Sequence, residues 1–308
     1  MSPSIASLAQ NDGANPGPVG VIGASSLVGN CLLPMLVQDG WQVTAFSRQG
    51  GPFGGEVTWR QLPAAASSTS KPLLPATERA TPYWISVAPL WVLAEHFSLF
   101  ESCGVRRLLV LSSTSRFSKD DSSDLQEQAI AQRLADAEAQ VQAWAASRGV
   151  ELVILRPTLI YGLGRDKNLC EIARFIRRFG FFPLLGAAQG LRQPVHAQDV
   201  ASACLAALRA PAAANRAYNI SGGSTLAYRQ MAAQVFVALG RPVRLLQVPL
   251  WVFSLALAVL RCLPPYRHWS AAMAERMNRD LVFDHGDATR DFAFAPRVFA
   301  LSREDLGK

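Results

Sequence analysis

A glycine-rich turn near the start of the chain has the residue types and spacing of a phosphate-binding loop. In "VGVIGASSLVG", Gly23 and Gly29 stand six residues apart, where an apolar run gives way to a helical pattern. The first glycine permits a tight turn, the last lets helix and strand pack closely, and N–H groups at the helix N-terminus can hold a pyrophosphate. Ser26 replaces the usual middle glycine, yet it keeps an N–H group and adds a hydroxyl. An ordinary strand-to-helix turn is the alternative. The residues predicted to bind a dinucleotide here are Gly23, Ser25, Ser26, Leu27, Val28 and Gly29.

The end of the next apolar run bears on which dinucleotide would bind. A site for NAD usually has an acidic residue here for the ribose 2′-OH, whereas an arginine favours the 2′-phosphate of NADP. The run ends in Ser47 and Arg48, and no acidic residue occurs between Asp39 and Glu56. The sequence therefore favours NADP(H) over NAD(H), with Ser47 and Arg48 as cofactor-binding residues.

The composition excludes several classes of protein. Half of the 308 residues are hydrophobic and 17% are charged, which is typical of a globular chain and not of a disordered one. The net charge is +7, but the arginines are scattered, so we expect bound phosphates and no nucleic acid. The five cysteines and four histidines have no metal-ligand or disulfide spacing. We therefore expect no metal and a reducing, cytoplasmic setting.

The pattern of elements that must position the glycine turn predicts an α/β fold. Short β-rich runs alternate with helical stretches from residue 18 to about 160, which favours a doubly wound parallel (Rossmann) sheet. A smaller, partly interleaved C-terminal substrate domain should follow. The predicted division is a flexible tail over 1–17, a Rossmann domain over 18–162 with 196–222 returning to it, and a substrate-binding part over 163–195 and 223–308.

The most apolar stretch is "VPLWVFSLALAVL", residues 248–260. Its thirteen residues fall short of the roughly 20 that span a bilayer. A buried or groove-facing helix is one interpretation, and docking on a membrane surface or a protein partner is the other. The second would place a cytoplasmic protein at the membrane periphery.

Several ordered motifs carry a resemblance to a known family. "LVLSSTS" at 109–115 precedes a long helix, "LRPTLIYG" occupies 155–162, "RQPVHAQD" occupies 192–199, and "RMNRDLVFDHGDATRDFAFAPRVF" lies near the C-terminus. The chain resembles the extended short-chain dehydrogenase/reductases, and within them the NAD-dependent epimerase/dehydratase group that acts on nucleotide sugars. The resemblance implies further cofactor contacts from Val87, Ala88, Ser112, Pro157 and Thr158. For the substrate it implies Arg192, Arg276 and Arg279 on a diphosphate, with Asn168 facing the cleft.

The chain departs from this family at its catalytic pair. The family has Tyr-x-x-x-Lys on the long helix, with a glutamate four residues after the lysine. Glu138 fits that glutamate, which places Leu134 at the lysine position and Ile130 at the tyrosine position. No Tyr-x-x-x-Lys occurs anywhere in the chain. The usual tyrosinate, with a pKa lowered by the lysine, is therefore absent.

Residues just after the fifth strand are the candidates to replace that pair. Ser113 stands at the family's catalytic Ser/Thr position, and Thr114 is beside it. Lys119 follows in the next loop and would act as an acid/base or hold a substrate phosphate, while Arg116 would bind substrate. A solvated loop ahead of the long helix is the alternative interpretation.

Three other polar residues near the cleft favour a structural role. In the family the tyrosine at position 161 usually supports structure near the nicotinamide. His196 and Asp199 are predicted to fix the turn into a helix, with Asp199 as a cap in its first turn.

Two functions remain open from the sequence. One is an NADP-linked reductase or epimerase acting on a nucleotide sugar or a similar small molecule. The other is a catalytically degenerate NADP-binding sensor or accessory protein, because relatives that lack the pair have such roles. A homodimer is compatible with both.

Overall fold

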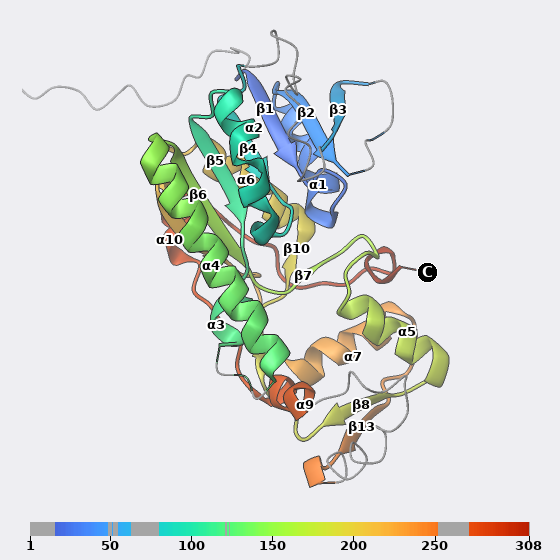
Figure 1. Ribbon diagram of the computed structural model, residues 1–308. Helices are drawn as coiled ribbons and strands as arrows, with labels where there is room; N and C mark the ends of the chain where they lie inside the picture. The colour runs from blue at the N-terminus through green and yellow to red at the C-terminus, as the bar shows by residue number, and fades with distance from the viewer. Residues whose placement is uncertain are drawn as a thin grey trace, which may run out of the picture.

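A seven-stranded parallel sheet forms the centre of the computed structural model (Figure 1). The structure describes residues 16–48, 51, 55–62, 80–120, 122, 124–251 and 271–307. The strand order is β11-β6-β5-β4-β1-β2-β3. The strands are β1 (Pro18–Ile22), β2 (Gln42–Ser47), β3 (Val57–Gln61), β4 (Tyr83–Ser86), β5 (Arg107–Leu111), β6 (Glu151–Pro157) and β11 (Arg216–Ile220). The predicted doubly wound parallel sheet is thereby confirmed.

Helices cover both faces of this sheet because its inner strands are apolar on both sides. Alternate residues of one strand enter different cores, so that Val21 packs on one face and Ile22 on the other. One face carries α1 (Leu27–Gln38), α6 (Ala197–Arg209) and α10 (Gly286–Phe292). The other carries η2 (Leu90–His96), α2 (Phe97–Ser102) and α4 (Leu125–Arg148). The sheet is thus buried between two helical layers.

A second apolar core lies beyond the carboxyl ends of the strands (Figure 1). It is built from α5 (Leu169–Phe179), β8 (Phe182–Leu185), α7 (Tyr228–Ala238), β13 (Leu245–Val248) and α9 (Ala271–Asn278). Short two-stranded pairs join β7 (Ile160–Tyr161) to β10 (Val195–His196), β9 (Leu191–Arg192) to β12 (Leu226–Ala227), and β8 to β13. The remaining short helices are α3 (Ser115–Ser118), η3 (Pro211–Ala213) and η5 (Glu304–Leu306).

Chain segments from the C-terminal half return to the sheet. Helix α6 packs against α1, and β11 pairs with β6 at the sheet edge, as the register of Tyr218 with Leu155 shows. Residues 1–15 of the expected N-terminal tail and residues 252–260 of the apolar stretch lie outside the described residues. Within the described ranges no helix is both long enough and apolar enough to cross a bilayer.

Candidate functional site

The glycine turn joins β1 to α1 and leaves no room for side chains. Gly23 has a φ of +80°, and a Cβ atom on it would lie 2.6 Å from the backbone nitrogen of Ala88. A Cβ on Gly29 would lie 2.4 Å from the carbonyl oxygen of Ala24. The tight turn and the close packing of helix and strand agree with the prediction, and the close approach of Ala88, after β4, is a further contact.

The Ser26 hydroxyl binds the backbone of its own helix, whereas the sequence suggested that it could contact a phosphate. Its Oγ accepts from the Gly29 N–H at 3.0 Å and so caps α1, while its own N–H donates to the Gly23 carbonyl at 2.9 Å. The next two N–H groups, of Leu27 and Val28, have no acceptor within the helix because they belong to its first turn. They fit a pyrophosphate, so a dinucleotide site is compatible with the serine.

One arginine that the sequence analysis did not single out lies across this turn. Arg165, in the loop after β7, donates from Nη2 to the carbonyl oxygen of Ser25 at 3.0 Å. The two residues are 140 positions apart in the chain. The only sequence signal is that Arg165 follows the "YG" motif by three residues.

The other residues predicted to bind cofactor lie at the same edge of the sheet. Ser47 is buried and Arg48 exposed at the end of β2. Val87 and Ala88 follow β4, Ser112 follows β5, and Pro157 and Thr158 end β6 or follow it. Since carboxyl ends of parallel strands share one edge, the fold brings these positions into one region.

A cleft of about 740 Å³ extends from the glycine turn to α9. Its lining includes Leu27 of the turn, the candidates Ser113, Thr114 and Lys119, and Arg192 and Arg276 from the C-terminal half. Asn168 also lines it, with an exposed side chain. The cleft thus brings together most of the predicted catalytic and substrate-binding residues.

The hydroxyls after β5 differ in what they contact. Thr114 donates from Oγ1 to the carbonyl oxygen of Pro157 at 3.2 Å, and its side chain is buried. Ser113 accepts at Oγ from the Ser115 N–H at 3.1 Å, which leaves its own proton available to a bound oxygen. Of the two, Ser113 is therefore better suited to orient a substrate.

Glu138, the residue that fits the family's glutamate, is the centre of a buried ion cluster. It accepts from Ser112 Oγ at 2.5 Å and from Arg156 at 3.0 Å (Nε) and 2.6 Å (Nη2). Arg116 forms a further ion pair with it. Burial raises the pKa of Glu138, but the hydrogen bonds from Arg156 and Ser112 outweigh this and hold the pKa below its usual value. Glu138 is therefore an anion. It accepts hydrogen bonds from the Ser112 hydroxyl and from one nitrogen of Arg116, so these two donors are not available to a ligand.

The two positions of the missing pair offer no replacement. On α4, Leu134 is buried and Ile130 is 39% exposed. Neither side chain can exchange a proton. Any proton transfer must therefore come from another element of the cleft.

Lys119 lies in a second ion cluster beside the cleft. Its Nζ is 3.9 Å from Oε1 of Glu127, which also pairs with Arg276 Nη1 at 2.7 Å and accepts from Ser122 Oγ at 2.8 Å. Burial lowers the pKa of Lys119; the nearby Arg276 adds to this and Glu127 opposes it. A lysine with a lowered pKa is suited to proton transfer.

Arg192 points its guanidinium at the end of α9. Nη1 donates to the carbonyls of Leu191 (2.6 Å) and Arg279 (2.7 Å), and Nη2 donates to that of Arg276. Burial lowers the pKa of Arg192 to about 10. Its diphosphate role stays a prediction, because these carbonyls already occupy both terminal nitrogens. Of the neighbouring pair, Arg276 lines the cleft and Arg279 does not.

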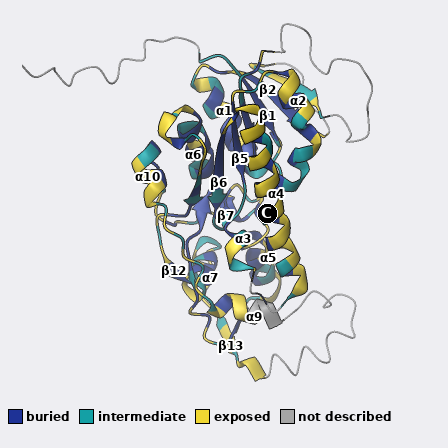
Figure 2. Ribbon diagram, turned by 60° about the vertical axis from the view of Figure 1, so that its left-hand side comes forward, coloured by how far each residue is buried: buried dark blue, intermediate teal, exposed yellow. Residues whose placement is uncertain are grey.

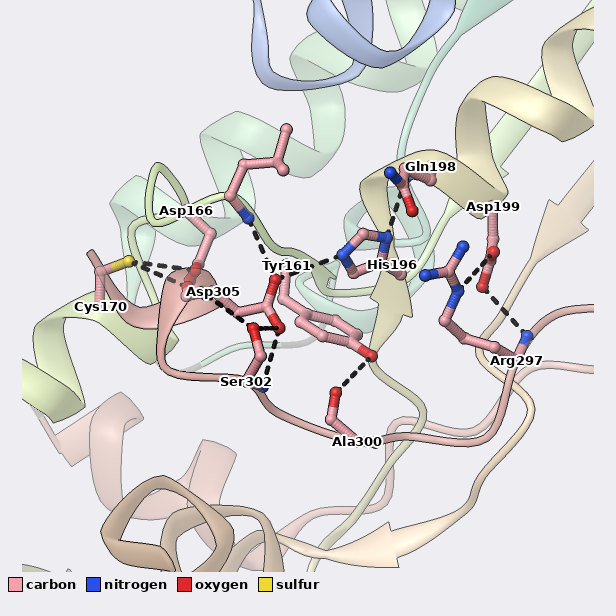
Figure 3. A network of polar contacts seen from close by, with 11 residues as sticks. Tyr161, Asp166, Cys170, His196, Gln198, Asp199, Arg297, Ala300, Ser302 and Asp305 are labelled. Carbon is pink, nitrogen blue, oxygen red and sulfur yellow. Dashed lines mark hydrogen bonds and ion pairs between the residues drawn. The ribbon is translucent and has the colours of Figure 1, made fainter. Parts of the chain in front are cut away.

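A polar network next to the cleft has a structural role (Figure 3). Tyr161 donates to the Ala300 carbonyl at 3.4 Å, and burial raises its pKa to about 12. His196 caps α6 by accepting from the Gln198 N–H at 3.2 Å, and its Nε2 lies 3.4 Å from Asp305. The network fixes the C-terminal segment against the loop that carries Arg165.

Asp199 is placed differently from its expected capping role. It lies in the first turn of α6, where its carboxylate accepts from the Arg297 side chain at 2.8 Å and backbone N–H at 3.0 Å. The cap itself comes from His196. Among the described residues, no three His, Cys, Asp or Glu side chains gather as a metal site.

Comparisons with known proteins bear on the family and the fold of the chain. Residues 90–221 match the model of the NAD dependent epimerase/dehydratase family. A stretch of 120 residues is 29% identical to the UDP-glucose 4-epimerase of Vibrio cholerae, covering 39% of this chain and 37% of that protein. The crystal structure of the UDP-glucuronic acid 4-epimerase of Bacillus cereus, in complex with NAD, has the same fold: the TM-score is 0.67 at 13% identity, with 94% of each chain covered.

A shorter match concerns a different kind of protein. Over 83 residues the chain is 31% identical to the mitochondrial NADH dehydrogenase [ubiquinone] 1 alpha subcomplex subunit 9 of Arabidopsis thaliana, covering 27% of this chain and 20% of that protein. In sequence, the chain thus spans well under half the length of either relative.

Proposed function

We propose that this chain belongs to the NAD-dependent epimerase/dehydratase family, whose model matches residues 90–221, and that it binds NADP(H) and acts on a nucleotide sugar or a similar phosphorylated molecule. The active site would be non-standard. Lys119 would exchange the proton, and Ser113 would orient the reacting oxygen, with Thr114 holding the end of β6 in place.

The observation that carries this proposal is the position of Lys119. It shares one cleft with Ser113 and with Leu27 of the glycine turn, and its pKa is lowered mainly by burial. At pH 7 a lysine of this kind has a larger neutral fraction than an exposed one, so it can take a proton from a substrate hydroxyl and return it.

A bound nicotinamide would accept the hydride from the substrate carbon or return it. Ser113 would donate a hydrogen bond to the substrate oxygen, and Lys119 would take or return the proton on that oxygen. Glu127, hydrogen-bonded by Ser122, would keep the ammonium form of Lys119 paired.

The charge of the cleft supports an anionic substrate. Four cationic side chains line it, Lys119, Lys167, Arg192 and Arg276, against Asp166 and Glu171. The guanidinium of Arg276 is 46% exposed and has donors free for phosphate oxygens beyond its contact with Glu127. Asn168, which lines the cleft, is a further substrate contact in this proposal. Arg116 pairs with Glu138 and is not among the lining residues, so it would contact substrate only through its remaining nitrogens. Ser47 and Arg48 support the choice of NADP(H).

Calorimetric titration tests the binding part of the proposal. The purified protein would be titrated with NADPH, NADH, NADP and NAD, and then with UDP-, GDP- and dTDP-sugars in the presence of the best cofactor. We expect NADPH to bind more tightly than NADH, and one nucleotide sugar to bind the loaded protein. Failure of all four dinucleotides to bind would contradict the proposal.

Substitution of Lys119 tests the catalytic part. With the nucleotide sugar identified, Lys119→Met should lower kcat by about 10²-fold or more, the range of general acid–base catalysis, and leave NADPH affinity unchanged. Lys167→Met is the matched control, since this lysine lines the same cleft but is exposed. Equal losses of kcat in both variants would show that only cleft charge matters.

A second candidate is an NADP-binding sensor or accessory protein without turnover. Ile130 and Leu134 in place of the catalytic pair favour it, and so does the engagement of Arg192 with three carbonyls. NADPH binding with no response to any nucleotide sugar would support this candidate. A cytoplasmic location and a homodimer are expected under either function.

A further inference from the structure

One wall of the cleft is apolar. It belongs to the second core, and Figure 2 shows the helices of that core, α5, α7 and α9, gathered beyond the central sheet. We define the apolar wall as six side chains that belong to this core or pack against it and also line the cleft: Leu159, Ile172, Phe175, Phe182, Met231 and Met277. Because all six join one hydrophobic cluster and border one cleft, they form a single surface of it.

The polar residues that line the cleft beside this wall already have partners inside the protein. Arg192 donates to three backbone carbonyls, and Gln193 accepts at Oε1 from the Phe283 N–H at 2.7 Å. Asp166 accepts at Oδ1 from two N–H groups at the start of α5, at 2.9 and 2.6 Å. These side chains bind the backbone of the chain itself, so few of their donors and acceptors remain for a ligand.

The polar side chains that remain are too few for a nucleoside. In the described part of the chain, the Asn168 amide and the Tyr228 hydroxyl line the cleft without a hydrogen-bond partner. The base, the ribose and the hexose of a nucleotide sugar carry many more polar groups than two side chains can satisfy. Each polar group that is buried without a partner costs free energy, so the wall suits an apolar group better.

A cation stands at the edge of the apolar wall. Arg276 and Met277 are consecutive on α9: the Arg276 side chain is 46% exposed and lines the cleft, and Met277 is part of the wall. Nη1 of Arg276 pairs with Glu127 at 2.7 Å, which leaves its other donors for an anion. Lys167 lines the same cleft and is exposed. The cleft therefore offers adjacent positions to an anionic group and an apolar one.

We propose that the substrate of this cleft is an amphipathic phosphate ester. Its phosphate would lie at Arg276, its reacting carbon near Ser113 and Lys119, and its apolar chain or ring along the apolar wall. The inference rests on the proposed function, because it requires the same cleft to accept a phosphorylated substrate, and it adds no chemical step. Among the phosphorylated molecules that this function allows, it favours one with an apolar group over a nucleotide sugar.

Titration of the full chain with alkyl phosphates of different length tests the inference. Calorimetry, with and without NADPH, would compare hexyl phosphate, decyl phosphate, decanol and UDP-glucose below the concentrations at which the alkyl probes form micelles. Decyl phosphate should bind at least about tenfold more tightly than hexyl phosphate, because each buried methylene strengthens binding by up to about fourfold. Decanol, which lacks the charge, and UDP-glucose, which lacks the apolar chain, should both bind more weakly than decyl phosphate.

Two pairs of variants locate the bound probe. Phe175→Gln should weaken decyl phosphate binding by about tenfold, whereas Phe179→Gln, on the same helix but not among the cleft-lining residues, should weaken it much less. Arg276→Met should weaken decyl phosphate binding and leave the affinity for decanol unchanged, with Arg290→Met on α10 as its control. The second pair changes exposed side chains, so it tests the inference even where Phe175→Gln fails to fold. Circular dichroism would check the folding of all four variants.

Three results would overturn the inference: equal affinities for hexyl and decyl phosphate, tighter binding of UDP-glucose than of decyl phosphate, and equal losses in each variant and its control. A protein that binds NADPH and prefers UDP-glucose would keep the proposed function and lose the inference. A protein that binds decyl phosphate with the expected dependence on chain length, but binds no dinucleotide, would lose the proposed function and keep the amphipathic ligand.

Discussion

Helix α4 carries two glutamates on one face that build clusters of similar composition and different character. Glu138 contacts one serine and two arginines, Ser112, Arg116 and Arg156. Glu127 contacts one serine, one lysine and one arginine: Ser122, Lys119 and Arg276. Three helical turns separate the two glutamates, which explains why they share a face. The clusters differ in burial and in which elements they join.

The Glu138 cluster joins α4 to α3 and to the carboxyl ends of β5 and β6. Glu138 is fully buried, and the side chain of Arg156 is 15% exposed. The Glu127 cluster connects α4 to α9 beside the cleft. Its carboxylate is 9% exposed, against 0% for Glu138, and its cations are 21% (Lys119) and 46% (Arg276) exposed, against 15% (Arg156) and 30% (Arg116) in the first cluster. Paired charges inside the fold fix a backbone, whereas paired charges at a cleft can change partners when a ligand arrives. This comparison predicts that the first cluster mainly affects stability and the second mainly affects binding.

The largest effect on stability should come from Glu138→Gln. Removing the charge of this fully buried carboxylate leaves the partly buried guanidinium groups of Arg156 and Arg116 without it. Breaking a buried pair costs about 3–5 kcal/mol, and the partial exposure of the arginines favours the lower end of that range. Urea unfolding would measure it. Glu101→Gln is the control, since its partner Arg148 is 55% exposed, and its effect should be a small part of that. Similar losses of unfolding free energy in Glu138→Gln and Glu101→Gln would contradict the stabilising role assigned to the Glu138 cluster.

The Glu138 cluster also predicts that the free energy of unfolding depends on pH in the acidic range. The pKa of folded Glu138 lies below its unfolded value, so its contribution is complete above about pH 4.3, the unfolded pKa, and is lost as pH falls toward the folded pKa. The difference in unfolding free energy between wild type and Glu138→Gln should therefore shrink below about pH 4.5. A difference that stays constant down to pH values near the folded pKa would contradict the assignment.

Glu127→Gln should have a smaller effect on stability, about 1 kcal/mol, because its partners are partly solvated. The clearer effect of Glu127→Gln should be on the pKa of Lys119. Glu127 raises the pKa of Lys119 against the larger effect of burial, so its neutralisation should lower that pKa further. Acylation of Lys119 followed by mass spectrometry across pH would measure this, with Lys167 as the internal control. An unchanged acylation profile of Lys119 would show that the pair is not formed in solution.

The smallest change in stability is expected for Arg276→Met, below about 1 kcal/mol, since this side chain is half exposed. Under the proposed function it should still weaken nucleotide-sugar binding by about tenfold, the worth of a charge-assisted hydrogen bond to phosphate. Arg290→Met, at an exposed ion pair on α10, is the control for titration calorimetry. Equal sugar affinity in the two variants would remove Arg276 from the proposed site.

The sheet and the glycine turn could be predicted from the sequence because their signals are local. Val21 and Ile22 belong to a run bounded by turn residues, and Gly23 and Gly29 lie six positions apart. Each pattern depends only on a few residues that are neighbours in the sequence. The loss of the catalytic pair at Ile130 and Leu134 is also a fact of the sequence alone.

The contacts of the charged side chains could not be predicted in this way. Arg192 was expected on a diphosphate, and the structure places it on carbonyls about 87 positions further along the chain. Arg165 contacts the glycine turn across 140 positions, and Arg276 on α9 pairs with Glu127 on α4. A long cation can reach many partners, and its choice depends on which backbones the fold brings near it.

The sequence by itself determined the α/β fold, the glycine turn and the absence of the Tyr-x-x-x-Lys pair, because hydrophobic period and turn chemistry are properties of short segments. The tertiary structure decided that Arg116 joins Glu138, that Ser26 caps α1, and that Lys119 and Arg276 share one glutamate beside the cleft. Those outcomes depend on packing between distant segments, where burial determines which charges must be paired.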